Sequence, residues 1–89
     1  MNWIVQWDKR AFREFEKIDR VWQEKIFRFI VDHIETEDDP RRLGKPLQGK
    51  FKGFWKYRIG DYRLVCHIQD EVLTVLILRA RHRSSVYNR

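Results

Sequence analysis

The sequence predicts an α+β fold with the element order β-α-α-β-β-β, in which a helical hairpin packs on one face of a small, twisted and mostly antiparallel sheet. Three observations lead to this prediction. Residues 54–68 alternate in the manner of two strands joined by a short turn at Gly60-Asp61. Residues 9–35 place apolar side chains at helical spacing, and residues 72–79 form a strongly apolar run.

The first half of the chain predicts one strand and two helices. Residues 2–7 alternate as a strand does, and Asp8 is placed to cap a helix from Lys9 to about Ile18. Asp19 restarts the pattern for a second helix, to about Glu35. The inner stripes are Ala11, Phe12, Phe15 and Ile18 on the first helix and Trp22, Ile26, Phe29, Ile30 and Ile34 on the second. Phe27 and Val31 widen the second stripe, so we expect that helix to be well buried.

The second half predicts a link, a strand hairpin and a last strand. Residues 37–46 contain two prolines and a glycine and predict a loop, which residues 49–53 continue into the hairpin. The run VLTVLILR at residues 72–79 predicts a central strand buried on both faces. Residues 79–89 form a tail with four arginines, a histidine and a tyrosine. We expect residues 1–89 to form a single domain.

The charge is distributed unevenly along the chain. The net charge is +6, but residues 1–39 carry 7 Lys and Arg against 10 Asp and Glu, whereas residues 40–89 carry 12 against 3. The basic half predicts an anionic partner, nucleic acid first, or else a solvated basic surface. A chain of this size favours an open functional face over a deep pocket.

Cysteine content and hydropathy indicate the cellular compartment of the protein. The single Cys66 excludes an internal disulfide framework and a cysteine zinc site, and it suits a reducing compartment. We expect it to be a small buried residue. With no signal peptide and no long apolar run in the sequence, we expect a soluble, cytoplasmic protein without a membrane partner.

Strand alternation gathers cations on one face of the predicted hairpin. Lys56, Arg58 and Arg63 belong to the face away from the helices, because an unpaired charge beneath a helix is costly. Arg79 and Arg81 share a parity and would converge on this face with Tyr87 if the last strand lies beside the hairpin. Guanidinium groups bind phosphate and an aromatic ring stacks on an unpaired base, which suits single-stranded RNA. The alternative is a set of unrelated surface charges with a core tyrosine.

Other site chemistries find little support. His33, His67 and His82 have no metal-ligand spacing, and no phosphate-binding glycine loop occurs, so we expect no metal and no cofactor. His67 shares a face of the predicted strand with Arg63 and is either a bystander or an RNA contact. His82 is a candidate proton carrier. Around the basic cluster, the expected RNA-binding residues are Lys52, His67, Arg79 and Arg83.

Several segments together resemble toxins of the RelE/ParE superfamily, from bacterial type II toxin–antitoxin modules. They are the RLGKPL link, the strand pair KYRIGDYRLVCHIQDE, the strand VLTVLILRA and the ending HRSSVY. The resemblance is to the RelE-like branch, and it implies a ribosome-dependent endoribonuclease, an mRNA interferase that cleaves mRNA in the ribosomal A site and inhibits translation. The other branch implies the alternative, a ParE-like DNA gyrase poison without nuclease activity.

The resemblance also implies site residues and a mechanism. The RelE-type basic cluster and C-terminal tyrosine are matched by Lys56, Arg58, Arg63, Arg81 and Tyr87. Arg58 stands where that branch often has lysine, and a guanidinium cannot act as a base. Attack of a ribose 2′-hydroxyl on the adjacent phosphate would give a 2′,3′-cyclic phosphate without a metal. Lys56, crowded by two arginines, is the best base candidate, and Arg81 or His82 would act at the leaving oxygen.

The same resemblance implies the partners. An acidic RelB-like antitoxin, disordered alone and ordered on binding, would wrap the toxin. The toxin–antitoxin complex would bind operator DNA through the antitoxin, and the free toxin would act on the ribosome with its mRNA. A glutamate base used by some members has no match here, because the hairpin contains only Asp61 in its turn.

Overall fold

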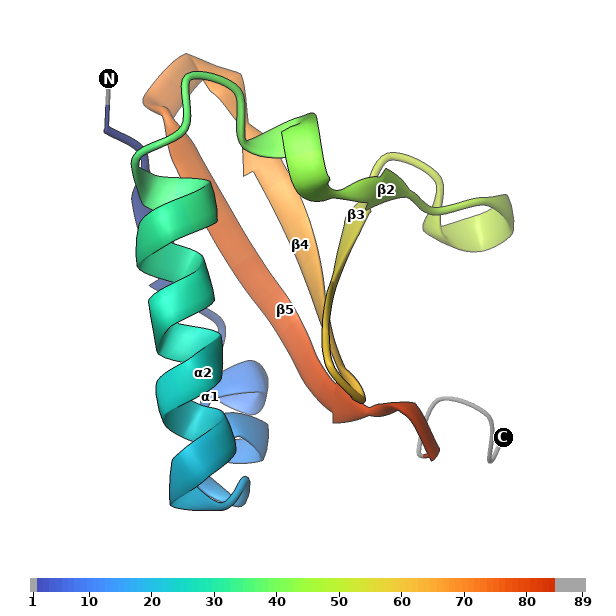
Figure 1. Cartoon of the computed structure of the whole chain (residues 1–89). Helices are drawn as coiled ribbons and strands as arrows, with labels where there is room; N and C mark the ends of the chain where they lie inside the picture. Colours follow the sequence, from blue (N-terminus) through green and yellow to red (C-terminus); the bar gives the residue numbers. More distant parts are fainter. Residues whose placement is uncertain (1, 85–89) are drawn as a thin grey trace.

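A computed structural model describes residues 2–84, and these form one mixed sheet with two helices on one of its faces (Figure 1). The strands are β1 (Ile4–Trp7), β2 (Lys45–Pro46), β3 (Trp55–Ile59), β4 (Tyr62–Gln69) and β5 (Thr74–His82). Their order across the sheet is β1-β5-β4-β3-β2. β1 runs parallel to β5, and every other neighbouring pair is antiparallel.

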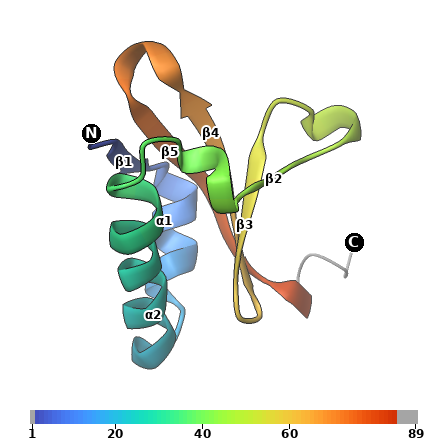
Figure 2. The ribbon, with the colours of Figure 1, turned by 45° about the horizontal axis from the view of Figure 1, so that its top comes forward.

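Two helices cover one face of this sheet (Figure 2). α1 spans Lys9–Glu16 and α2 spans Arg20–Ile30, after which Val31–Glu35 continue as a π-helical turn. The side chains of Asp8 and Asp19 accept hydrogen bonds of 3.0 Å from the amides of Arg10 and Trp22, so each aspartate caps the helix that follows it. Short 3-10 turns lie at Pro40–Leu43, Gly49–Phe51 and Asp70–Val72.

The core lies between the helices and the sheet. Its members are apolar side chains that project inwards from both layers: Trp3, Ala11, Ile18, Ile26, Ile30, Ile34, Tyr57, Ile59, Leu64, Cys66, Ile68, Val75, Ile77 and Ala80. Tyr57 is fully buried, and its hydroxyl donates to the carbonyl of Pro40, which satisfies the one polar atom of that ring. Cys66 is fully buried, as predicted, and its burial raises the pKa of the thiol.

The β3–β4 turn contacts the N-terminal end of α2. Gly60 has a φ of +59°, the left-handed conformation that a two-residue hairpin turn requires. A Cβ at Gly60 would lie 2.2 Å from Cη2 of Trp22, so the indole ring lies directly against the turn. Trp22 also packs on Tyr62, with ring centroids 5.7 Å apart. This contact fixes the hairpin relative to the helices.

The predicted fold class and element order are confirmed, and three details differ. The last strand begins at Thr74 and continues to His82, so it contains residues that were assigned to the tail. It is not buried on both faces, because helices cover only one, and Leu76 stays partly exposed. The link contributes the short edge strand β2.

Two helical aromatics are more exposed than predicted. Phe12 is 45% exposed and Phe27 is 63% exposed. Phe12 contacts Trp7 and Phe15 at the outer margin of the core, where the sheet ends at β1. Phe27 lies on the side of α2 that faces solvent, because the sheet provides only one surface for the helix to contact.

Candidate functional site

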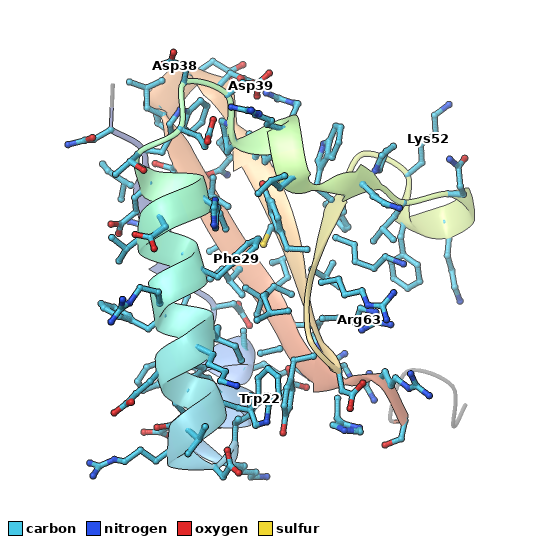
Figure 3. All side chains as sticks on the ribbon, viewed as in Figure 1. Trp22, Phe29, Asp38, Asp39, Lys52 and Arg63 are labelled. Carbon is cyan, nitrogen blue, oxygen red and sulfur yellow. The ribbon has the colours of Figure 1, made fainter. Side chains whose placement is uncertain are left out.

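Three arginines lie in one row across three adjacent strands. Arg58 of β3 is directly opposite Arg63 of β4, and Arg63 is directly opposite Arg81 of β5. Residues paired in this way project from the same face, with Cβ atoms about 5 Å apart. We call these three residues the arginine row. It lies on the face of the sheet turned away from α1 and α2, here called the open face, where Figure 3 shows Arg63 projecting away from the helices.

A β-bulge places Arg81 in this row. Val65 pairs with Arg79 whereas Cys66 pairs with Ile77, so Leu78 is an extra residue in β5. Val75 and Ile77 face the helices, and strict alternation would turn Arg79 and Arg81 towards the helices as well. The extra residue reverses the alternation, so that Ala80 is buried and Arg81 reaches the open face.

A second pair of cations adjoins the arginine row. Lys56 lies two residues before Arg58 on the same face of β3, and Lys45 of β2 pairs with Lys56. The predicted grouping of Lys56, Arg58 and Arg63 on one face is therefore confirmed by the strand register. Lys45 was not predicted as a site residue, because the link was expected to be a loop. The signal that locates it is the two-residue strand that it forms opposite Lys56.

The electrostatics of the open face favour an anionic ligand. Like charges directly opposite each other in a sheet are destabilising, and the arginine row contains two such pairs. Among the described residues, no carboxylate forms an ion pair with Lys56, Arg58 or Arg63. Within residues 2–84, the hydrogen bonds of the Arg58 and Arg63 guanidiniums are contacts of 3.5 Å to the carbonyls of Gly60 and Tyr62. Phosphate oxygens would give them the charge-assisted hydrogen bonds that the described part of the chain does not supply.

Arg79 was predicted to contact RNA, and the structure places its guanidinium in an ion pair with Glu14. Its guanidinium donates to Glu14 of α1, with Nη2 2.6 Å from Oε2, and the same carboxylate accepts the Ala80 amide at 2.8 Å. Glu14 thus accepts a hydrogen bond from the β5 backbone at a point where β1 has ended and no longer pairs with β5. Burial alone would raise the pKa of Glu14, but the bonds from Arg79 and Ala80 and the charges of Arg79 and Arg81 outweigh burial and lower that pKa. The structure therefore ties Arg79 to α1 rather than grouping it with the arginine row.

His82 is not brought together with the arginine row. It pairs with Tyr62, on the side of the sheet where the rings of Trp22 and Tyr62 pack, and its ring meets the Tyr62 ring edge-on at 5.2 Å. Its Nδ1 lies 2.8 Å from the Ser84 hydroxyl oxygen. Arg81, the preceding residue in the strand, projects from the opposite face. This placement puts the His82 imidazole and the Arg81 guanidinium on opposite faces of the sheet.

The remaining predicted residues lie around the cluster or outside the described chain. His67 is on the open face of β4, and Lys52 lies in the loop before β3, at the far end of the sheet from the helices (Figure 3). The amide of Arg83 donates to the Asp61 carbonyl at 2.7 Å, and its side chain lies 3.7 Å from the Asp61 carboxylate, which joins the end of β5 to the hairpin turn. Tyr87 lies outside the described residues.

The described residues contain neither a cluster of metal-binding side chains nor a membrane-spanning helix. Within residues 2–84, no group of three His, Cys, Asp or Glu side chains could hold a metal ion. No helix in that range is long and apolar enough to cross a membrane.

Comparison with known proteins gives consistent matches along nearly the whole chain. Residues 5–87 match the family described as the ParE toxin of the type II toxin–antitoxin system parDE. The chain is 35% identical over 89 residues to the toxin RelG of Mycobacterium tuberculosis, covering 100% of both proteins. It is 30% identical over 91 residues to the mRNA interferase toxin RelE of Escherichia coli, covering 99% of this chain and 93% of that protein.

A solved structure matches the fold closely. The toxin–antitoxin complex RelBE2 of Mycobacterium tuberculosis contains a chain with a TM-score of 0.85 and 34% identity, over 93% of this chain and 100% of that one.

Proposed function

Because the chain belongs to the RelE/ParE family of toxins from type II toxin–antitoxin systems, and to its RelE-like branch, we propose that it is a ribosome-dependent endoribonuclease that cleaves mRNA in the ribosomal A site. The relative from Escherichia coli carries the name mRNA interferase, and this supports the assignment. Such an activity would be exerted in the cytoplasm, where it would stop translation. A single domain of 89 residues would carry it.

The arginine row is the observation that carries this proposal. Cleavage of RNA by its own 2′-hydroxyl passes through a phosphorane with additional negative charge, and positive groups held in place before the reaction stabilise that charge most effectively. Arg58, Arg63 and Arg81 come from three different strands and are held by the sheet. A protein that acts only by binding another protein has no need to keep this repulsive arrangement.

The chemistry assigns one role to each cation. The Lys56 amine would accept the proton of the 2′-hydroxyl, whose oxygen forms a bond to phosphorus as the bond from phosphorus to the 5′-oxygen breaks. Arg58 and Arg63 would hold the non-bridging phosphate oxygens. Arg81 would stabilise the charge on the leaving 5′-oxygen, which takes a proton from water. The products are a 2′,3′-cyclic phosphate and a 5′-hydroxyl, and Tyr87 would stack on or orient the nucleotide.

The shape of the site supports dependence on the ribosome. The arginine row lies on the open face, where Arg58 is exposed and Arg63 and Arg81 are partly exposed, so the toxin by itself does little to orient a flexible RNA. Correct placement of reacting groups can contribute several orders of magnitude to a rate. We infer that the ribosomal A site supplies this placement by presenting the mRNA backbone to the open face.

The partner that controls the toxin would be an acidic antitoxin of the RelB type. The chain matched in the Mycobacterium tuberculosis structure belongs to a toxin–antitoxin complex. Residues 40–89 of the present chain carry 12 basic and 3 acidic residues, and an acidic segment ordered on binding would neutralise this charge. The resulting complex would bind operator DNA through the antitoxin.

Substitution of the arginine row tests the function. We expect Arg63→Ala and Arg81→Ala each to lower cleavage on mRNA-programmed ribosomes by on the order of 10²-fold or more, the usual effect of losing one contact to the transition-state charge. Primer extension on messages from translating cells should show cuts in phase with codons for the native toxin only. Thermal unfolding serves as the fold control, and Arg63→Ala should not lower the melting temperature because it removes like-charge repulsion.

The same experiment distinguishes the ribonuclease from the alternative, a ParE-like gyrase poison. We consider this alternative because the chain matches the ParE toxin family. A gyrase poison would leave messages intact and induce DNA damage. If the double substitution of Arg63 and Arg81 still inhibits growth fully, with intact mRNA and DNA damage, the ribonuclease proposal is wrong and gyrase is the target.

A further inference from the structure

The open face carries an aromatic pair next to its cations. Phe54 immediately precedes β3 and is in phase with Lys56, and His67 lies on β4 in phase with Arg63. The two rings meet edge to face, with centroids 5.6 Å apart and planes at 63°. Both side chains are partly exposed, so the pair presents ring surface to solvent on the face that carries the arginine row.

The surroundings of this pair are cationic. Lys56 lies between Phe54 and Arg58 along the strand, and Lys45 lies opposite Lys56. On the other side of His67, the strand register places Leu76 of β5 and then Gln6 of β1. At the open-face positions of β2 to β5 among the described residues, none is an aspartate or a glutamate. Ring surface bordered by lysines, without carboxylates, is complementary to a nucleobase joined to phosphates.

The spacing of the strands relates the pair to the arginine row. Side chains two residues apart on one strand face are roughly 6.6 Å apart. The open face therefore presents successive rows of side chains, from the arginine row through Lys56 and Lys45 to Phe54 and His67. An extended single strand that crosses these rows would place a base over the aromatic pair while the phosphate next to it lies near Lys45.

We propose that Phe54 and His67 form a base-stacking subsite for a nucleotide adjoining the cleaved linkage, and that Lys45 holds the phosphate between that nucleotide and the linkage. This inference rests on the proposed ribonuclease function and extends it to a second nucleotide. Stacking on a ring is tolerant of base identity, so the subsite would fix the register of the RNA on the toxin without reading its sequence.

Binding of uncleavable oligonucleotides tests the subsite. The probe is a fluorescent tetranucleotide with 2′-O-methyl groups throughout, which cannot be cleaved by 2′-hydroxyl attack, together with versions that are abasic at one position each. Binding to the full-length toxin, freed from its antitoxin, is measured by fluorescence anisotropy at low salt. For the native toxin, one abasic position should weaken binding about 5- to 150-fold, the usual effect of losing one stacked base.

Variants of the aromatic pair locate that effect. Phe54→Leu should weaken binding of the intact probe to the level of the abasic probe and leave the abasic probe unaffected. Phe54→Tyr and His67→Phe keep a ring and should bind nearly as the native toxin does. Phe27→Leu is the matched control, because Phe27 is 63% exposed on α2, on the other side of the sheet. It should change no affinity, and melting temperatures verify that each variant is folded.

The outcomes separate the subsite from the function on which it rests. If Arg63→Ala weakens binding of both probes whereas Phe54→Leu changes neither, the subsite is wrong and the phosphate site stands. If Phe54→Leu weakens intact and abasic probes equally, Phe54 acts by packing alone and the stacking proposal is overturned. If the native toxin binds no probe and Arg63→Ala retains full cleavage on ribosomes, both proposals fail.

Discussion

The contact between the hairpin turn and α2 gives a quantitative test of the structure. Gly60 has a φ of +59°, and a Cβ there would lie 2.2 Å and 2.5 Å from two atoms of the Trp22 indole. Gly60→Ala therefore has two costs. The left-handed backbone costs roughly 1–2 kcal/mol for a residue with a Cβ. Forcing a methyl group against the ring costs typically about 1–3 kcal/mol more. The sum is about 2–5 kcal/mol.

Gly49 provides the matched control for backbone strain. Its φ is +68°, but a Cβ there would meet nothing within 4 Å. Gly49→Ala should therefore cost only the backbone component, about 1–2 kcal/mol. The difference between the two variants measures the contact of the turn with α2. In urea unfolding followed by circular dichroism, we expect Gly60→Ala to be less stable than Gly49→Ala by about 1–3 kcal/mol.

A double-mutant cycle identifies the indole ring as the cause. In a Trp22→Ala background the space beside Gly60 is open, so Gly60→Ala should then cost no more than Gly49→Ala. Equal costs for Gly60→Ala and Gly49→Ala in the native background would refute the reasoning, because the ring would then not lie against the turn. The hairpin carries Arg58 and Arg63, so we also expect Gly60→Ala to lower ribosomal cleavage by more than Gly49→Ala does.

Two further predictions concern Arg79 and His82, neither of which the structure groups with the arginine row. Glu14→Gln should destabilise the fold by about 1.5–3 kcal/mol at pH 7, because charge-assisted bonds from Arg79 and Ala80 are weakened. The pKa of Glu14 is lowered in the folded chain, so this stabilisation is present above the ordinary value of 4.5 and is lost as the pH falls through the folded value. The native protein should then approach the variant in stability as the pH falls through the lowered pKa of Glu14, and a gap between them that persists in acid unfolding experiments would contradict the ion pair. His82→Ala should change cleavage on programmed ribosomes only a few-fold, because His82 lies against Tyr62 and away from Arg81. A loss as large as that of Arg81→Ala would restore His82 as the acid.

The fold was predictable because local signals and the global arrangement agree. Asp8 and Asp19 cap helices where the periodicity begins, and the Gly60-Asp61 pair can form the tight turn that sets the register of the two strands. Once that register is known, Arg58 and Arg63 must face each other and Lys56 must share their face. This part of the candidate site follows from alternation alone.

Partners distant in sequence were not predictable from local pattern. The Phe12 side chain belongs to a regular apolar stripe, yet it lies beyond the edge of the sheet. The sequence of a helix does not show how wide the sheet beneath it is. Arg79 resembled Arg81 in the sequence, but the end of β1 leaves an open edge on β5 that Glu14 caps, 65 residues away from Arg79. An ion pair of this kind depends on how two elements meet in space.

The position of Arg81 depends on a feature that sequence periodicity works against. Residues Val75 and Ile77 face the core, and a regular strand would turn Arg81 towards it too. A guanidinium turned into the apolar core would lose its hydration, which is costly. The extra residue Leu78 removes this conflict by reversing the alternation after Ile77. It does so where β5 passes from the apolar part of the sheet to the arginine row. One inserted residue thus lets a single strand stabilise the core with its first half and complete the arginine row with its second.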